Sequence, residues 1–144
     1  MDDNNLGARW SSRAPRFLSI LRIMTAFLFL QFGSTKLFAF PGAVVPGGGT
    51  VPPTSLGGVA GILELVGGAF LLVGLFSRPV AFVLSGLMAV AYFYGHAGGG
   101  FWPVLNGGAP AVIFCFVWLY VSAAGPGPWS IDALRRRRAE AGAR

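Results

Sequence analysis

Four long apolar segments occupy most of the 144-residue chain, and they limit it to few folds. The segments cover residues 17–40, 56–76, 80–97 and 109–124, against a need of roughly 17–25 residues for a helix that spans a bilayer. Only 11% of the residues are charged and 54% are hydrophobic, which is outside the usual balance of a soluble domain. The sequence therefore predicts an all-α integral membrane protein, with a four-helix bundle over residues 17–124, an N-terminal segment over 1–16 and a basic tail over 125–144.

Positively charged residues stand at alternate ends of these segments. Three arginines precede the first segment, Arg78 lies between the second and third, and residues 135–138 are all arginine, whereas the connections at 41–55 and 98–108 hold no lysine or arginine. No clean small-x-small cleavage site follows the first segment, so a retained helix is expected rather than a secretory signal. By the positive-inside rule, both termini are expected to be cytoplasmic in a multi-pass membrane protein.

The basic tail begins with a helix-capping sequence. Ser130 offers an N-cap and Asp132 an acid in the first turn, so residues 131–143 are predicted to form a short surface helix. Its arginines are expected to bind anionic membrane lipids, with docking of a protein as the alternative, and a nucleic-acid partner is not expected. Arg22 and Arg78 are expected to snorkel to the inner headgroups.

Glu64 is the only acidic residue within the four apolar segments. A carboxylate in hydrocarbon is costly unless a partner or a water cavity receives it. Lys36, the chain's only lysine, lies near the outer end of the first segment and is expected at a depth from which it can reach Glu64, whereas Arg22 lies about 21 Å of helical rise from Lys36 and is too deep. Small residues on the face of Glu64 predict close helix approach and are compatible with a homodimer: Gly57, Gly61 and Gly68.

Further scarce residues are expected at the same outer depth. His96, the only histidine, ends the third segment, with Tyr92 one turn earlier on the same face. The sequence predicts one site in the outer half of the bundle, in which Glu64, Lys36 and His96 are the catalytic candidates and the binding candidates are Lys36, Glu64, Tyr92, His96, Phe101, Trp102 and Asn106. Purely structural roles remain open: an ion pair, an interfacial histidine and an interfacial tryptophan anchor.

Metals and bound redox cofactors are poorly supported. One histidine and one cysteine, Cys115, cannot supply an ordinary zinc, bis-histidine haem or iron–sulfur site. No metal and no covalently bound cofactor is therefore expected, and any electron transfer must involve a diffusible species or a partner.

Several motifs taken together resemble the DoxX family of small bacterial membrane proteins, from about Arg22 to Asp132. The resemblance rests on Arg22 with Phe32-Gly33-Ser34-Thr35-Lys36-Leu37, on Gly61-Ile62-Leu63-Glu64-Leu65-Val66-Gly67-Gly68 with Gly74 and Arg78, on His96 with Phe101-Trp102-Pro103, on Asn106-Gly107-Gly108, and on Gly125-Pro126-Gly127-Pro128-Trp129-Ser130-Ile131-Asp132. It implies a four-helix bundle in the bacterial cytoplasmic (inner) membrane and an association with quinone-linked sulfur and thiol oxidation and with oxidative-stress defence. The family pattern places a glutamate where this chain has Ala109, so a carboxylate of the family's site is absent here.

Three functions follow as hypotheses, and the sequence leaves open whether the chain is an enzyme. The first is a membrane component of a quinone-linked redox or oxidative-stress system, as an oxidoreductase subunit with a quinone pocket, in which Glu64 relays protons. The second is a non-enzymatic scaffold that assembles soluble redox proteins through its tail. The third is transport or sensing of a small molecule or lipid.

Overall fold

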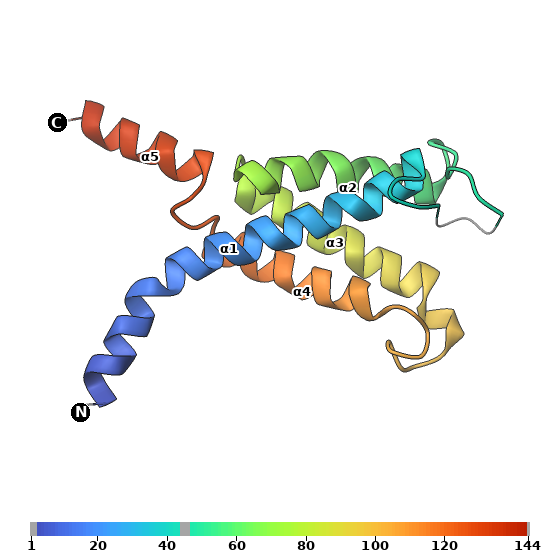
Figure 1. The fold of residues 1–144 in the computed structure, drawn as a ribbon, viewed down its shortest axis with the longest axis horizontal. Helices are drawn as coiled ribbons and strands as arrows, with labels where there is room; N and C mark the ends of the chain where they lie inside the picture. The colour runs from blue at the N-terminus through green and yellow to red at the C-terminus, as the bar shows by residue number, and fades with distance from the viewer. Residues whose placement is uncertain (1–2, 44–46, 144) are drawn as a thin grey trace.

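The computed structural model describes residues 3–43 and 47–143, which form helices joined by loops (Figure 1). The elements within these ranges are α1 (Asp3–Phe38), α2 (Leu56–Val73), α3 (Ser77–Gly95), the 3₁₀ turn η1 (Ala97–Gly99), α4 (Ala109–Ala124) and α5 (Ile131–Gly142). No strand occurs among the described residues. The predicted all-α class is confirmed.

Three of the described helices are long and apolar enough to cross a membrane. These helices cover Gly7–Phe38, Leu56–Val73 and Ser77–Gly99. α4 is also apolar, but its 16 residues rise about 24 Å, which is less than the roughly 30 Å of a hydrocarbon core.

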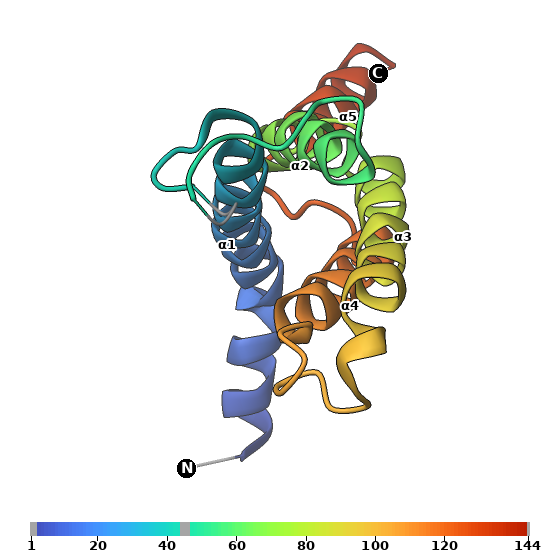
Figure 2. The ribbon, with the colours of Figure 1, turned by 90° about the vertical axis from the view of Figure 1, so that its right-hand side faces the viewer.

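The first four helices pack in chain order around a common core. α1 lies against α2, α2 against α3, α3 against α4, and α4 returns to α1 (Figure 2). Between them Phe29 packs on Phe114 and Trp118, with ring centroids 5.1 Å and 5.6 Å away. The N-terminus and α5 lie at one end of this group, the basic end, and the loops between α1 and α2 and between α3 and α4 lie at the other, the loop end (Figure 1).

Two helices begin earlier than the apolar pattern predicts. α1 starts at Asp3 and continues through Pro15, and Figure 1 shows that it changes direction in this first part. Proline lacks an N–H and its ring crowds the preceding turn, which bends a helix. α3 starts at Ser77, so Ser77–Pro79, which lie between the second and third apolar segments, form the first helical turn of α3. N–H groups in a first turn have no partner inside the helix, so proline is tolerated there.

Arg22 organises the basic end, and the expectation that it snorkels to headgroups is wrong. Its side chain is fully buried. It donates to the carbonyl oxygens of Leu71, Leu72, Pro126 and Trp129, at 2.8 Å for Leu72, 2.9 Å for Pro126 and 2.5 Å for Trp129. Since the last carbonyls of a helix have no intrahelical donor, one guanidinium satisfies the end of α2 and also fixes the linker after α4.

That linker approaches α1 closely because it carries a glycine at the contact. Gly127 has a φ of 75°, and a Cβ added there would lie 2.3 Å from Ser19 Oγ. The same hydroxyl accepts a hydrogen bond from Trp129 N at 3.2 Å. The linker therefore lies directly on α1, within reach of Arg22.

Asp132 joins α5 to the start of α3. Ser130 caps α5 as predicted, because its side chain accepts from Ala133 N, but the Asp132 carboxylate accepts from Phe76 N at 2.9 Å and Ser77 N at 2.8 Å. Burial alone would raise the pKa of Asp132, but these hydrogen bonds and the positive charge of Arg135 outweigh it and hold the pKa below its usual range. Asp132 thus caps α3 from 55 residues away along the chain.

Replacing Asp132 with alanine should lower the free energy of unfolding by about 1 kcal/mol at neutral pH, the usual loss for a helix cap. Because the pKa of this carboxyl is lower in the folded than in the unfolded protein, its contribution is present above about pH 4 and is lost as the pH falls through the folded pKa. Unfolding in mixed detergent micelles at neutral and at acidic pH measures both effects. If the wild type and the Asp132→Ala variant differ in free energy of unfolding by the same amount at both pH values, this assignment is contradicted.

α1 and α2 touch at glycines near the loop end. A Cβ added at Gly33 would lie 2.7 Å from Gly61 O and 2.9 Å from Leu65 N, and one at Gly61 would lie 3.2 Å from Lys36 Cβ. The backbones are therefore in contact, as small residues on a helix face allow. This approach brings Lys36 beside α2.

Replacing Gly33 with alanine should push α1 and α2 apart and destabilise the protein by about 1–3 kcal/mol, the usual cost of overpacking. The clash is with backbone atoms, which cannot rotate away. Gly86 is the matched control, since it lies inside α3 and a Cβ there meets nothing within 4 Å. Thermal unfolding in detergent should show a loss for Gly33→Ala and none for Gly86→Ala, and equal midpoints would show that this contact is loose.

Candidate functional site

Lys36 and Glu64 form an ion pair between α1 and α2. Lys36 Nζ lies 2.5 Å from Glu64 Oε1, and the side chains are 25% and 3% exposed. The contact expected from the shared depth of these residues is therefore present. The glycine contact between α1 and α2 leaves room for it, because the lysine can lie across Gly61.

A cavity of about 150 Å³ adjoins this pair in the centre of the four helices. Lys36, Glu64 and His96 line it together. The remaining wall is apolar and comes from α1, α3 and α4 with the loop before α4: Phe29, Phe32, Met88, Ala91, Gly107, Pro110, Ala111 and Phe114. The cavity, called the central cavity below, thus combines three ionisable side chains with an aromatic wall.

One oxygen of Glu64 has no hydrogen-bond partner among the described residues. Oε1 accepts from Lys36, whereas Oε2 is buried and unpaired. A buried polar atom without a partner costs free energy, so such atoms in folded proteins are few and call for a specific explanation. Because Glu64 lines the central cavity, a hydrogen-bond donor inside the cavity would satisfy Oε2.

His96 follows α3 directly and presents one ring nitrogen to the protein. Nδ1 lies 3.2 Å from the carbonyl oxygen of Asn106. Since a carbonyl oxygen only accepts, Nδ1 carries the proton in this contact. A neutral ring then leaves Nε2 as an acceptor, and a protonated ring has a second donor.

The other candidates lie outside the central cavity. Tyr92, Phe101 and Trp102 line a neighbouring apolar groove of about 500 Å³ between α3, α4 and the loop end. Asn106 holds its own loop, because its side chain donates to Gly100 O and accepts from Gly108 N, both at 2.8 Å. The structure therefore brings together Lys36, Glu64 and His96 at the central cavity, whereas the other four candidates do not line it.

The apolar wall of the central cavity was not among the candidate residues. Phe32 precedes Lys36 by four positions, and Met88 precedes Tyr92 by four, so both share helix faces with candidates. Phe114 sits in a helix without any charged residue. Helical spacing could have indicated the first two, but nothing in the sequence relates Phe114 to Glu64.

Lys36 also borders a groove on the side of the helices. A groove of about 240 Å³ between α2 and α3 is lined by Lys36, Leu56, Ala60, Leu87, Val90 and Ala91, with other residues of both helices. Lys36 and Ala91 line this groove and the central cavity alike. The lysine therefore stands between the interior and the side of the bundle.

Comparison with known proteins places the chain in one family. The DoxX family profile matches residues 17–97, which hold most of α1, all of α2 and α3, and Lys36, Glu64 and His96. A protein of Haemophilus influenzae with the name "Uncharacterized protein" is 40% identical over 121 residues, which cover 82% of this chain and 90% of that protein. No solved structure matches the chain. More than half of the residues match the family profile, and apolar helices suited to a bilayer carry the match, so this membrane protein belongs to the DoxX family.

Proposed function

We propose that this protein is a component of a quinone-linked redox or oxidative-stress system in the bacterial cytoplasmic membrane. In this proposal α1 to α4 cross the bilayer and both termini are cytoplasmic, because the arginines gather at the basic end. α4 is shorter than the other three helices, and the loop before it completes the crossing.

The unpaired oxygen of Glu64 carries the proposal. It is buried, it belongs to a residue that lines the central cavity, and that cavity also holds a lysine and a histidine. An ion pair that served packing alone would have no need of a cavity beside it. A ligand with hydrogen-bonding oxygens on a flat apolar ring matches both the ionisable groups and the aromatic wall.

The size of the cavity limits the ligand. About 150 Å³ is below the roughly 300–1,000 Å³ of most ligand pockets, so the cavity accepts a single ring and excludes a long tail. The groove between α2 and α3 offers a place for that tail, because Lys36 and Ala91 border both spaces. A quinone ring with a lipid chain fits this division, and it would enter sideways from the membrane.

The chain's own residues can handle protons but not electrons. Reduction of a quinone to a quinol takes up two electrons and two protons. Lys36, and His96 when its ring is protonated, would donate hydrogen bonds to the ring oxygens, and Glu64 would take up and pass protons. The electrons would come from a thiol or another small reductant, or from a partner protein.

A binding measurement tests this function. The purified protein in neutral detergent should bind a short-chain quinone at micromolar concentration, and equilibrium dialysis measures this binding. An alkylbenzene of similar size, which lacks the ring oxygens, should bind much more weakly. Absence of quinone binding would refute the proposal, and equal binding of both compounds would mean that the cavity recognises only apolar surface.

A further inference from the structure

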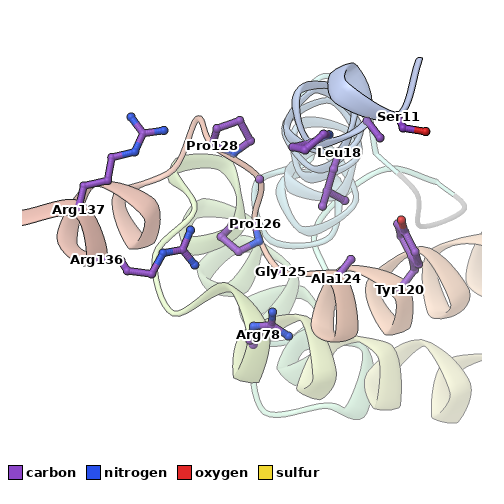
Figure 3. Close-up of a pocket in the computed structure, with 13 residues that line it drawn as sticks. Ser11, Leu18, Arg78, Tyr120, Ala124, Gly125, Pro126, Pro128, Arg136 and Arg137 are labelled. Atoms are coloured by element: carbon purple, nitrogen blue, oxygen red, sulfur yellow. The ribbon is translucent and has the colours of Figure 1, made fainter. Parts of the chain in front are cut away.

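A second pocket lies at the basic end, far from Glu64. It has a volume of about 440 Å³, within the roughly 300–1,000 Å³ of small-molecule sites. α1, α3, α4, the linker of residues 125–128 and α5 all contribute to its wall, and Figure 3 shows Arg78, Arg136 and Arg137 around it with Leu18 and Tyr120. None of these residues lines the central cavity.

The charge of this pocket has one sign. Arg78, Arg136 and Arg137 line it, and no carboxylate does among the described residues. The two acidic groups on α5 are Asp132, whose carboxylate accepts from Phe76 N and Ser77 N, and Glu140, which meets Arg136 at 4.0 Å with both side chains largely exposed. Such a pair contributes little in solvent, so the pocket keeps an excess of positive charge.

Arg78 is held in place by the protein. Its Nη1 donates to Ser122 O at 3.1 Å and to Ala123 O at 2.5 Å, which are carbonyls at the end of α4. Its Nη2 lies beside Gly125, where an added Cβ would come within 3.1 Å. A glycine at this position therefore leaves the guanidinium open toward the pocket. Arg78 is bound to the end of α4 and can still contact a ligand in the pocket, rather than extending freely into headgroups.

Apart from Ser11 and the hydroxyl of Tyr120, the side chains in the rest of the wall are apolar. Leu18 of α1 and Tyr120 of α4 face the pocket together with Ala14 and Pro128. A free inorganic anion would gain nothing from this surface. A ligand that carries both a phosphate and an apolar portion would use the arginines and the apolar wall at once.

We propose that this pocket binds the phosphodiester headgroup of an anionic phospholipid. Arg78, Arg136 and Arg137 hold the phosphate, and the acyl chains leave the pocket over Leu18 and Tyr120, between α1 and α4. α5 is then fixed on the membrane surface by one lipid, beyond a diffuse attraction of its arginines. The site is independent of quinone binding in the central cavity.

Matched double variants test the site. Arg136→Gln with Arg137→Gln removes two charges that line the pocket, whereas Arg135→Gln with Arg138→Gln removes two charges from the same helix outside it. Native mass spectrometry of the purified full chain with phosphatidylglycerol and with phosphatidylcholine measures retention of each lipid. We expect the first pair to weaken phosphatidylglycerol binding about tenfold and the second to change it less than about threefold.

The remaining outcomes are equally decisive. Equal losses in both double variants would mean that α5 attracts anionic lipid without a site, and equal binding of the two lipids would mean that the headgroup charge is not recognised. Millimolar inorganic phosphate or glycerol 3-phosphate should fail to displace phosphatidylglycerol, and displacement would identify a free phosphate as the ligand. Circular dichroism of both variants checks folding, which is expected to be intact because all four arginines are exposed.

Discussion

Replacing Arg22 with methionine is expected to destabilise the folded protein by at least about 3 kcal/mol. The variant would remove a donor from the carbonyl oxygens of Leu71, Leu72, Pro126 and Trp129, of which Leu71 O also accepts from Gly74 N at 3.2 Å. Each buried acceptor left unsatisfied costs about 1–3 kcal/mol, and water cannot reach the site easily because Arg22 is fully buried. The end of α2 and the linker before α5 should loosen together.

Unfolding by sodium dodecyl sulfate in mixed micelles measures this loss, with Arg16→Met as the matched control. Arg16 lies on the same helix, is exposed and makes no described hydrogen bond, so its loss should change stability by less than about 0.5 kcal/mol. The stability loss of Arg22→Lys should lie between those of Arg22→Met and Arg16→Met, because an ammonium cannot bind four acceptors as the guanidinium does. An unchanged midpoint for Arg22→Met would mean that these carbonyls find other donors.

The helices could be predicted from the sequence, whereas the contacts that lock their ends could not. A run of apolar residues bounded by glycine and proline is a local signal, and α4 begins and ends at the predicted residues. The carbonyl oxygens that accept from Arg22 lie 49 to 107 positions from it in the sequence. The N–H groups that donate to the Asp132 carboxylate lie 55 and 56 positions from Asp132. No local pattern distinguishes such an arginine from one that extends to headgroups.

The candidate site divides in the same way. Lys36 and Glu64 could be paired from the sequence because charges are scarce in hydrocarbon and helical rise fixes their depth. Asn106 and Trp102 lie in a loop whose path depends on Gly100 and Gly107, at φ of 126° and 73°, and on hydrogen bonds within the loop. Sequence spacing carries no information on where such a loop directs its side chains.

Replacing Glu64 with glutamine should weaken binding of a short-chain quinone by about 10–100-fold. Glutamine keeps the shape of the side chain but removes the charge, and hydrogen bonds to charged groups contribute about 1.5–3 kcal/mol. The change also removes the counter-charge of Lys36, which lies 2.5 Å away, so stability should fall as well. Dialysis at several quinone concentrations measures the affinity, and Glu140→Gln, an exposed carboxylate of α5, is the matched control that should bind as the wild type does.

A double variant separates the ligand site from a purely structural ion pair. Lys36→Met alone should cost about 3–5 kcal/mol, because it leaves a buried carboxylate without its partner, whereas Lys36→Met with Glu64→Leu should restore most of that stability by replacing the pair with apolar groups. If the pair serves the ligand, the double variant folds and binds no quinone. If the pair serves packing alone, the double variant binds the quinone as the wild type does. In that case, water satisfies the buried Oε2 of Glu64 in the wild-type protein.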